Sequence, residues 1–163
     1  MSRTEVPGHV RKEMERAKAS GDAADLEEVD LEGADLREAE LARANLMGAK
    51  LRGVNFEGAD LRRAKLRSAD LRVANLKGAN LEGADLSRAQ LAGANLDGAR
   101  LRGANFWSAN LLMANLENTD VFGARFNLTN LEGVRFANAD LREVDFGGAN
   151  LEGANLENAK LTE

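Results

Sequence analysis

Apolar residues occupy every fifth position of this chain from Leu26 to Leu161 without one insertion, which makes 28 repeats. The residue two places before each central position is small and nearly always Ala, and the residue between them is usually Asp or Asn. The repeating unit is therefore A-[DN]-L-x-x. Its period of five matches neither the 3.6 residues of an α-helical turn nor the two-residue alternation of a β-strand.

Glycine indicates how each repeat ends. Of the 16 glycines, 13 lie two places after a central residue, and Asn118, Asn138 and Asn158 share that position. Gly and Asn tolerate a positive φ angle, which the third position of a type II turn requires. Each repeat is therefore predicted to be a short extended piece followed by a corner.

On this repeat the chain resembles the pentapeptide-repeat proteins across residues 24–163. The resemblance implies an all-β fold, a right-handed quadrilateral β-helix in which four repeats make one square coil. Central residues and the preceding Ala point inward, and about seven coils of 20 residues follow from the length. Residues 20 apart then form columns. One column contains Phe106, Phe126 and Phe146, and the predicted structural core is represented by Leu26, Leu66, Leu86, Phe106, Phe126 and Phe146.

Residues 1–23 precede the repeats and are predicted to form a separate N-terminal segment, with residues 24–163 as the β-helix domain. Apolar residues at helical spacing predict a helix over about residues 6–20 that caps the first coil. Pro7 lies in its first turn and Gly21 near its end. The spaced residues are Val6, Val10, Met14 and Ala17.

The C-terminal end shows no matching cap, because the repeat runs in phase to Leu161. An unpaired strand edge favours aggregation unless something covers or blunts it. Two interpretations remain open: the polar residues Glu157, Lys160 and Glu163 protect the edge, or a second copy stacks there to give a homodimer, as some members of the family do.

Charge changes sign along the chain. The formal net charge is −5, and it divides into +1 over residues 1–23, −7 over residues 24–40, +6 over residues 41–77 and −5 over residues 78–163. Columns of like amides, such as Asn55, Asn75, Asn95 and Asn115, are predicted to hydrogen-bond along the rod, and columns of alternating charge to pair. Whether the basic belt of residues 41–77 has a function of its own is left open.

Nothing in the sequence predicts catalysis. The chain has no Cys, and its single histidine, His9, lies in the predicted cap. Glycines follow the repeat instead of gathering into a phosphate loop, and Asp120 and Asp140 would be exposed and unsupported as an acid pair. We therefore expect no enzyme, no cofactor and no metal site. No apolar stretch is long enough to cross a membrane or to form a signal peptide, which makes the cytoplasm the expected location.

Five large apolar residues occupy outward positions within residues 107–128, where most outward residues are polar or Gly. Outside that range, Met47 and Val73 are the clear large apolar residues at outward positions. Scattered apolar residues are normal on protein surfaces, but aromatic residues and Met are enriched at interfaces. We interpret these five residues as a partner-binding surface, called here the apolar cluster. Its members are Trp107, Leu112, Met113, Phe122 and Leu128.

The predicted function is that of a non-enzymatic protein-interaction module without a small-molecule substrate. Resemblance to the quinolone-resistance members of the family implies a DNA mimic that binds DNA gyrase or topoisomerase IV and gives drug or toxin tolerance. The basic belt interrupts the negative charge that such a mimic needs. The alternative is a structural or scaffolding protein that binds an unrelated partner through the apolar cluster. The net negative charge argues against direct nucleic-acid binding.

Overall fold

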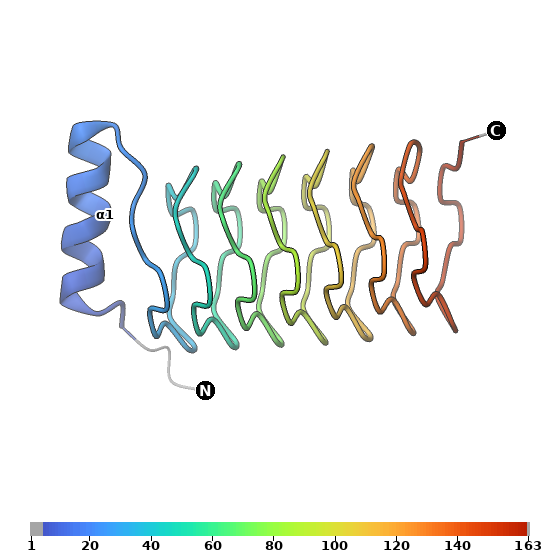
Figure 1. The fold of residues 1–163 in the computed structure, drawn as a ribbon, viewed down its shortest axis with the longest axis horizontal. Helices are drawn as coiled ribbons and strands as arrows, with labels where there is room; N and C mark the ends of the chain where they lie inside the picture. The colour runs from blue at the N-terminus through green and yellow to red at the C-terminus, as the bar shows by residue number, and fades with distance from the viewer. Residues whose placement is uncertain (1–4, 163) are drawn as a thin grey trace.

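The computed structural model describes residues 5–162 as a rod with one helix, α1 (Gly8–Ser20), lying across one end (Figure 1). Coils of similar size follow α1 one after another, and the C-terminus lies at the opposite end of the rod.

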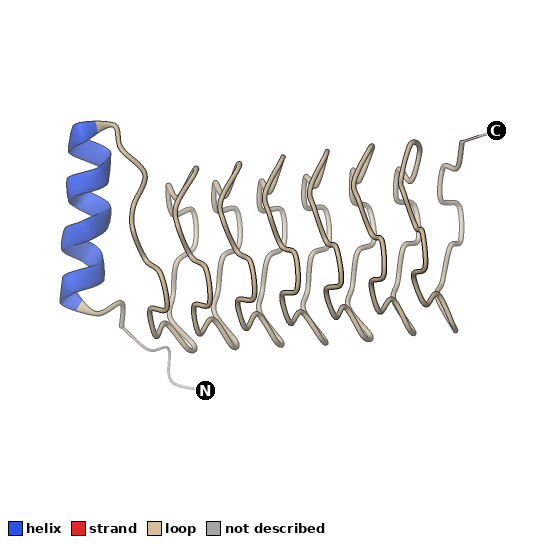
Figure 2. Ribbon diagram, viewed as in Figure 1, coloured by secondary structure: helices blue, strands red, loops and turns tan. Residues whose placement is uncertain are grey.

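Backbone pairing fixes the register of the coils. Parallel bridges join residues 20 apart, from Asp25 and Asn45 to Asp140 and Lys160. The N–H of Leu26 donates to the carbonyl of Asn45 at 2.7 Å, and the pattern continues along the rod. Each bridge is one residue long, so the described repeats contain no continuous strand and are drawn as loop in Figure 2. The 20-residue register confirms four repeats per coil, whereas the total of about seven coils stays a prediction.

Every corner has the left-handed backbone that the glycine positions predict. The residue two places after the central one has a positive φ throughout residues 28–158, including non-glycine residues such as Val73 (φ 51°) and Leu128 (φ 57°). A left-handed conformation costs an L-residue about 1–2 kcal/mol. The corners persist at such residues because their N–H groups are also paired to the neighbouring coil; that of Val73 donates to Ala92 at 3.0 Å.

The core consists of the central residues and the small residues before them. Leu66, Leu86, Phe106 and Phe126 are fully buried, and Leu26 is 4% exposed. The rings of Phe106 and Phe126 stack with centroids 4.6 Å apart, and those of Phe126 and Phe146 are 5.6 Å apart. The predicted aromatic column is present in the structure.

Phe146 differs from the other predicted core residues because it is only partly buried, although it packs against the core. Phe146 lies in the last described coil, so no further coil covers the outer side of its ring. The ring of Phe126, by contrast, has a neighbouring ring on each side. The same exposure affects Leu156 and Leu161, which are 40% and 60% exposed.

α1 begins two residues later than the predicted helix and ends at the predicted place. Pro7 is the N-cap and makes no side-chain capping hydrogen bond, whereas Gly21 closes the helix in a left-handed conformation (φ 75°). Val10 and Ala17 are buried, with Val6 and Met14 partly buried beside them. The predicted apolar face of the helix therefore rests on the first coil.

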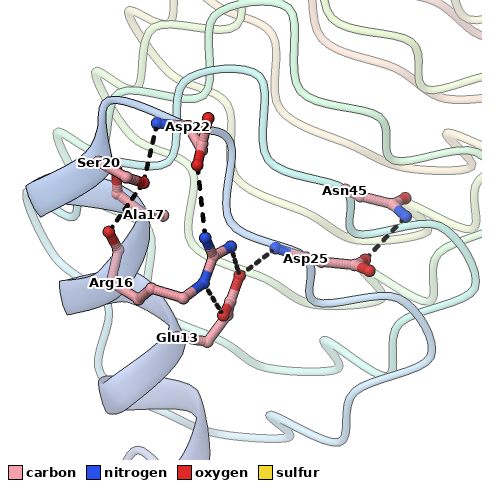
Figure 3. A network of polar contacts seen from close by, with 7 residues as sticks. All are labelled: Glu13, Arg16, Ala17, Ser20, Asp22, Asp25 and Asn45. Atoms are coloured by element: carbon pink, nitrogen blue, oxygen red, sulfur yellow. Dashed lines mark hydrogen bonds and ion pairs between the residues drawn. The ribbon is translucent and has the colours of Figure 1, made fainter.

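One carboxylate fastens α1 to that coil. Glu13 accepts two hydrogen bonds from the Arg16 guanidinium at 2.7 and 2.8 Å and a third from the Asp25 N–H at 2.9 Å (Figure 3). The Arg16 side chain, followed by the Asp25 N–H, lowers the pKa of Glu13 to about 2. Arg16 also reaches Asp22 at 3.5 Å, which links the helix to the turn after it.

Candidate functional site

The apolar cluster lies at outward positions of the rod. Met113 is 67% exposed, Leu128 58%, Trp107 38% and Phe122 36%, while Leu112 is partly buried. The 20-residue register places the cluster in two consecutive coils on three adjoining sides. Val73, also at an outward position, is 58% exposed but lies two coils earlier in the column of Met113.

Trp107 and Leu128 occupy one side, one coil apart. The guanidinium of Arg88 lies 5.1 Å from the centroid of the Trp107 ring, so one face of the indole contacts a cation. Leu128 leans along its column toward Gly148, where an added Cβ would lie 2.8 Å from its Cδ2. Glycine at position 148 thus leaves room for Leu128 to lie flat on the rod.

Phe122 lies between two arginines of its own column. The guanidinium carbons of Arg102 and Arg142 are 5.5 and 5.7 Å from its ring centroid. Each arginine also binds a carboxylate: Arg102 donates to Asp120 at 2.5 Å, and Arg142 donates to Asp140 at 2.8 and 2.6 Å. Phe122 is therefore held in place by a charged frame, and part of its ring remains open to solvent.

Met113 and Leu112 form the third side. Met113 lies over Gly133, where an added Cβ would collide with its Sδ. The five residues predicted from sequence therefore lie in neighbouring coils but on three sides of the rod, with Phe122 and Met113 two sides apart, so they do not form one flat face.

Arginine and aspartate pair within a repeat, which sequence reasoning missed. Arg62 donates to Asp60 at 2.8 and 2.5 Å, and Arg72 donates to Asp70 at the same two distances. Side-chain hydrogen bonds from these arginines are the main cause that lowers the pKa of Asp60 and of Asp70. The signal was available, because the tripeptide D-L-R occurs at residues 35–37, 60–62, 70–72 and 140–142 and forms this two-bond pair each time.

Pairing between coils, which the sequence did predict, is also present. Within the first amide ladder, each Asn donates to the one before it at 3.0, 3.4 and 3.2 Å from Asn55 to Asn115. Lys77 and Asp97 are 3.7 Å apart in a column of alternating charge. Part of the surface charge on the rod is thus paired between neighbouring coils.

The groups considered for catalysis are either exposed or engaged. His9 is exposed on α1, and Asp120 and Asp140 are bound to arginines as described. Over residues 5–162, no three His, Asp or Glu side chains gather in a way that could hold a metal ion. Within the same range, α1 is neither long nor apolar enough to cross a bilayer.

A cleft of about 940 Å³ lies where the end of α1 meets the rod, and sequence periodicity gave no sign of it. Residues 17–18 and 21–24 form one wall, and the other comes from the first three coils. Ala42 is an outward residue too small to fill the space. Arg43 and Arg63 line the cleft as well, and so does the Lys18–Glu40 ion pair, which is 2.9 Å long.

Comparison with known proteins gives a family and a set of structural neighbours. The family model of pentapeptide repeats matches residues 24–63, 55–89, 84–121 and 129–163, with eight copies. No curated protein sequence matches the chain.

Solved structures of similar proteins were found. HetL, a pentapeptide repeat protein involved in heterocyst differentiation regulation in the cyanobacterium Nostoc, is 38% identical with a TM-score of 0.82. That match covers 85% of this chain and 64% of HetL, so the chain spans less than two thirds of that neighbour. A pentapeptide repeat protein of the Arabidopsis thaliana thylakoid lumen is 35% identical over 57% of this chain and 65% of its own, with a TM-score of 0.56.

QnrB1, a plasmid-mediated fluoroquinolone resistance protein, is 21% identical with a TM-score of 0.57 over 85% of this chain and 80% of its own. At that identity the likeness concerns the fold alone. These neighbours share a right-handed β-helix and differ in the roles that their names describe.

Proposed function

Because the chain belongs to the pentapeptide-repeat family, we propose that it acts by binding another protein with the outer surface of a rigid rod. The apolar cluster is the centre of that contact. The observation that carries this proposal is the exposure of Trp107, Met113, Phe122 and Leu128 in two consecutive coils, at positions that are otherwise nearly all polar or Gly. Aromatic residues and Met are enriched at the desolvated centres of interfaces.

The test removes the aromatic members without touching the core. Trp107→Ser with Phe122→Ser is expected to leave the thermal unfolding midpoint nearly unchanged and to abolish partner binding or self-association, measured by light scattering and by pull-down. Arg52→Ser with Arg72→Ser, two exposed outward residues in earlier coils, is the matched control and should keep the binding. Association that is equal in all three proteins would exclude the cluster as the contact.

A second candidate is the DNA mimic that binds DNA gyrase or topoisomerase IV. It is supported by the acidic C-terminal half, where Glu132, Glu143, Glu152 and Glu157 are exposed and make no ion pair within residues 5–162. Dense negative charge is what a DNA-binding saddle would recognise. The fold shared with QnrB1 is compatible with this role.

Gyrase supercoiling assays test this candidate directly. The protein at micromolar concentration should inhibit supercoiling or relieve a quinolone block, and replacing those four Glu by Gln should abolish the effect. A control variant makes the same change of charge near α1, by replacing four other glutamates with Gln together: Glu27, Glu28, Glu32 and Glu38. No effect of the unmodified protein at any concentration would exclude gyrase as a partner.

Three further proposals concern the chain as a whole. The division into residues 1–23 and 24–163 is kept as the domain boundary, and the cytoplasm as the location. Homodimerisation through the C-terminal end is supported by the exposed Leu156 and Leu161. Light scattering should then give twice the monomer mass, and Leu161→Lys should return the mass to that of one chain.

A further inference from the structure

Five exposed cations that make no ion pair within residues 5–162 lie next to one another around one corner of the rod, on two adjoining sides. Among the other cations of the basic belt, Lys50 pairs with Asp30, Arg62 with Asp60, Arg72 with Asp70 and Lys77 with Asp97. Arg52 is exposed and makes no ion pair within residues 5–162, but it lies on another side of the rod. We call the five neighbouring cations the basic stripe. It consists of Arg43, Arg63, Lys65, Arg67 and Arg88.

The register makes the stripe continuous. Arg43 and Arg63 are 20 residues apart and occupy the same place in consecutive coils. Arg63 is the corner residue (φ 57°) just before the repeat that contains Lys65 and Arg67, and the Arg88 position lies one coil beyond Ser68. At its far end the Arg88 guanidinium covers the Trp107 ring.

The local sequence explains why these charges lack partners. The repeat at residues 65–67 reads K-L-R in place of D-L-R, so Arg67 has no carboxylate in its own repeat. Asp85 is in register with Lys65 but accepts hydrogen bonds from Asn105 at 3.1 Å and from the Ser87 N–H at 3.0 Å. Cations placed one above the other, as Arg43 and Arg63 are, weaken a β stack. Stability of the rod therefore does not account for the stripe.

A hollow adjoins the stripe at its α1 end. Arg43 and Arg63 line the cleft of about 940 Å³ together with Gly21 and Ala42. The acids in its wall include Glu40, which is paired with Lys18, and Asp60, which is paired with Arg62. Glu82 also lines the cleft and makes no ion pair within residues 5–162, so the unpaired charges of this region are Arg43, Arg63 and one carboxylate. The two arginines leave a positive charge that an acidic ligand can neutralise.

We propose that the basic stripe binds a short, extended, acidic peptide segment of a partner protein. Alternate residues of an extended chain lie about 6.6 Å apart, and Lys65 and Arg67 are alternate residues on either side of the central Leu66. Carboxylates at every second position of a peptide therefore match these two cations in spacing, and a further carboxylate can reach Arg63 at the preceding corner. The acidic regions on either side, residues 24–40 and 78–163, repel any polyanion that extends beyond the stripe, which favours a short peptide over a nucleic acid.

The experiment uses a fluorescently labelled heptapeptide in which Ser and Glu alternate and carry three Glu in total. Binding is followed by anisotropy with the full chain, and by the fluorescence of Trp107, the only tryptophan, beside Arg88. We expect salt-sensitive binding that falls about tenfold when Arg63, Lys65 and Arg67 are each replaced by Gln. The control variant loses the same amount of charge at three arginines that are ion-paired: Arg102, Arg135 and Arg142 are each replaced by Gln.

Several results would overturn the proposal. One is that the peptide does not bind even at millimolar concentration. Another is that both triple variants lose the same amount of affinity for the peptide. A third is that an isomeric peptide with its three Glu in one block binds with equal affinity. Tighter binding of a single-stranded oligonucleotide of similar charge would assign the stripe to nucleic acid instead. The variants change exposed side chains, and circular dichroism of each confirms that it is folded. The stripe is separate from the groups replaced in the tests of the proposed function, so its outcome is independent of them.

Discussion

A leucine in this chain has one of two roles, set by its place in the repeat. Leu86 is a central residue and fully buried, whereas Leu128 lies two places after a central residue on the same side of the rod and is 58% exposed. Removing buried methyl groups costs transfer free energy and leaves a cavity, while an exposed leucine contributes little.

Leu86→Ala is therefore expected to lower the free energy of unfolding by about 2–5 kcal/mol, and Leu128→Ala by less than about 0.5 kcal/mol. Urea unfolding followed by circular dichroism measures both. Equal effects of the two variants would contradict the assignment of inward and outward positions.

Asp140 gives the stability a dependence on pH. Hydrogen bonds from the Arg142 side chain are the main cause that lowers its pKa from 3.8 to about 2. Because the folded pKa lies below the unfolded one, this stabilisation is complete above about pH 4 and is lost as the pH falls toward 2.

Asp140→Asn should remove that part of the acid sensitivity. The difference in unfolding free energy between the original protein and the variant is expected to be about 1 kcal/mol at pH 6, since the paired Arg142 is half exposed, and to shrink toward zero at pH 2. Denaturant melts across this range provide the measurement. A difference that stays constant with pH would show that the Asp140 carboxylate is not the cause.

The helix and the repeats meet through a polar link as well as an apolar one. Val10 and Ala17 are buried in the contact between α1 and the first coil. The Glu13 carboxylate accepts hydrogen bonds from both the Arg16 guanidinium and the Asp25 N–H. Loss of Glu13 leaves the Asp25 N–H without its partner, but it removes nothing from the interior of the rod.

Glu13→Gln should therefore loosen α1 selectively. Hydrogen exchange of the amides of residues 8–20 is expected to become faster, with little change in the coils beyond the first. Glu15→Gln, on the exposed part of the same helix, is the control and should change neither region. Faster exchange throughout the rod would mean that α1 and the repeats unfold as one unit.

The architecture of the whole molecule depends on a register of 20 residues. Deleting residues 84–103 removes one complete coil and brings the corner at Gly83 directly to Ala104, so every later column keeps its side of the rod. Deleting residues 84–101 removes two residues fewer and moves every later apolar residue out of phase.

The 20-residue deletion is expected to unfold cooperatively at a midpoint somewhat below that of the full chain, because a solenoid is held by contacts between neighbouring coils. The 18-residue deletion should lose the cooperative transition. Circular dichroism during heating distinguishes the two. Cooperative folding of both deletions would contradict the register.

Most of the fold could be predicted because its causes are local and repeated. The position of Gly33 predicts a corner that Glu38, five residues later, also adopts, and the spacing of Leu26 and Leu46 predicts a buried column. The partial burial of Phe146 was missed, since it depends on the end of the stack and not on the repeat.

The candidate surface could be predicted only in outline. Sequence located Trp107 and Phe122 at outward positions, but not the arginine side chains over their rings, which come from other coils. The D-L-R pairs were readable from the sequence but were overlooked. The cleft beside α1 depends on how the helix rests on the first coil, and no periodicity encodes that geometry.

The claim that a protein binds at the apolar cluster can be tested most directly by photo-crosslinking. A photoreactive aromatic residue is placed at position 107 and, in a second protein, at position 77, the equivalent outward position on another side of the rod. If the apolar cluster is the contact, position 107 crosslinks to a partner or to a second copy in high yield and position 77 does not. Equal yields at both positions, or none at position 107, would contradict it.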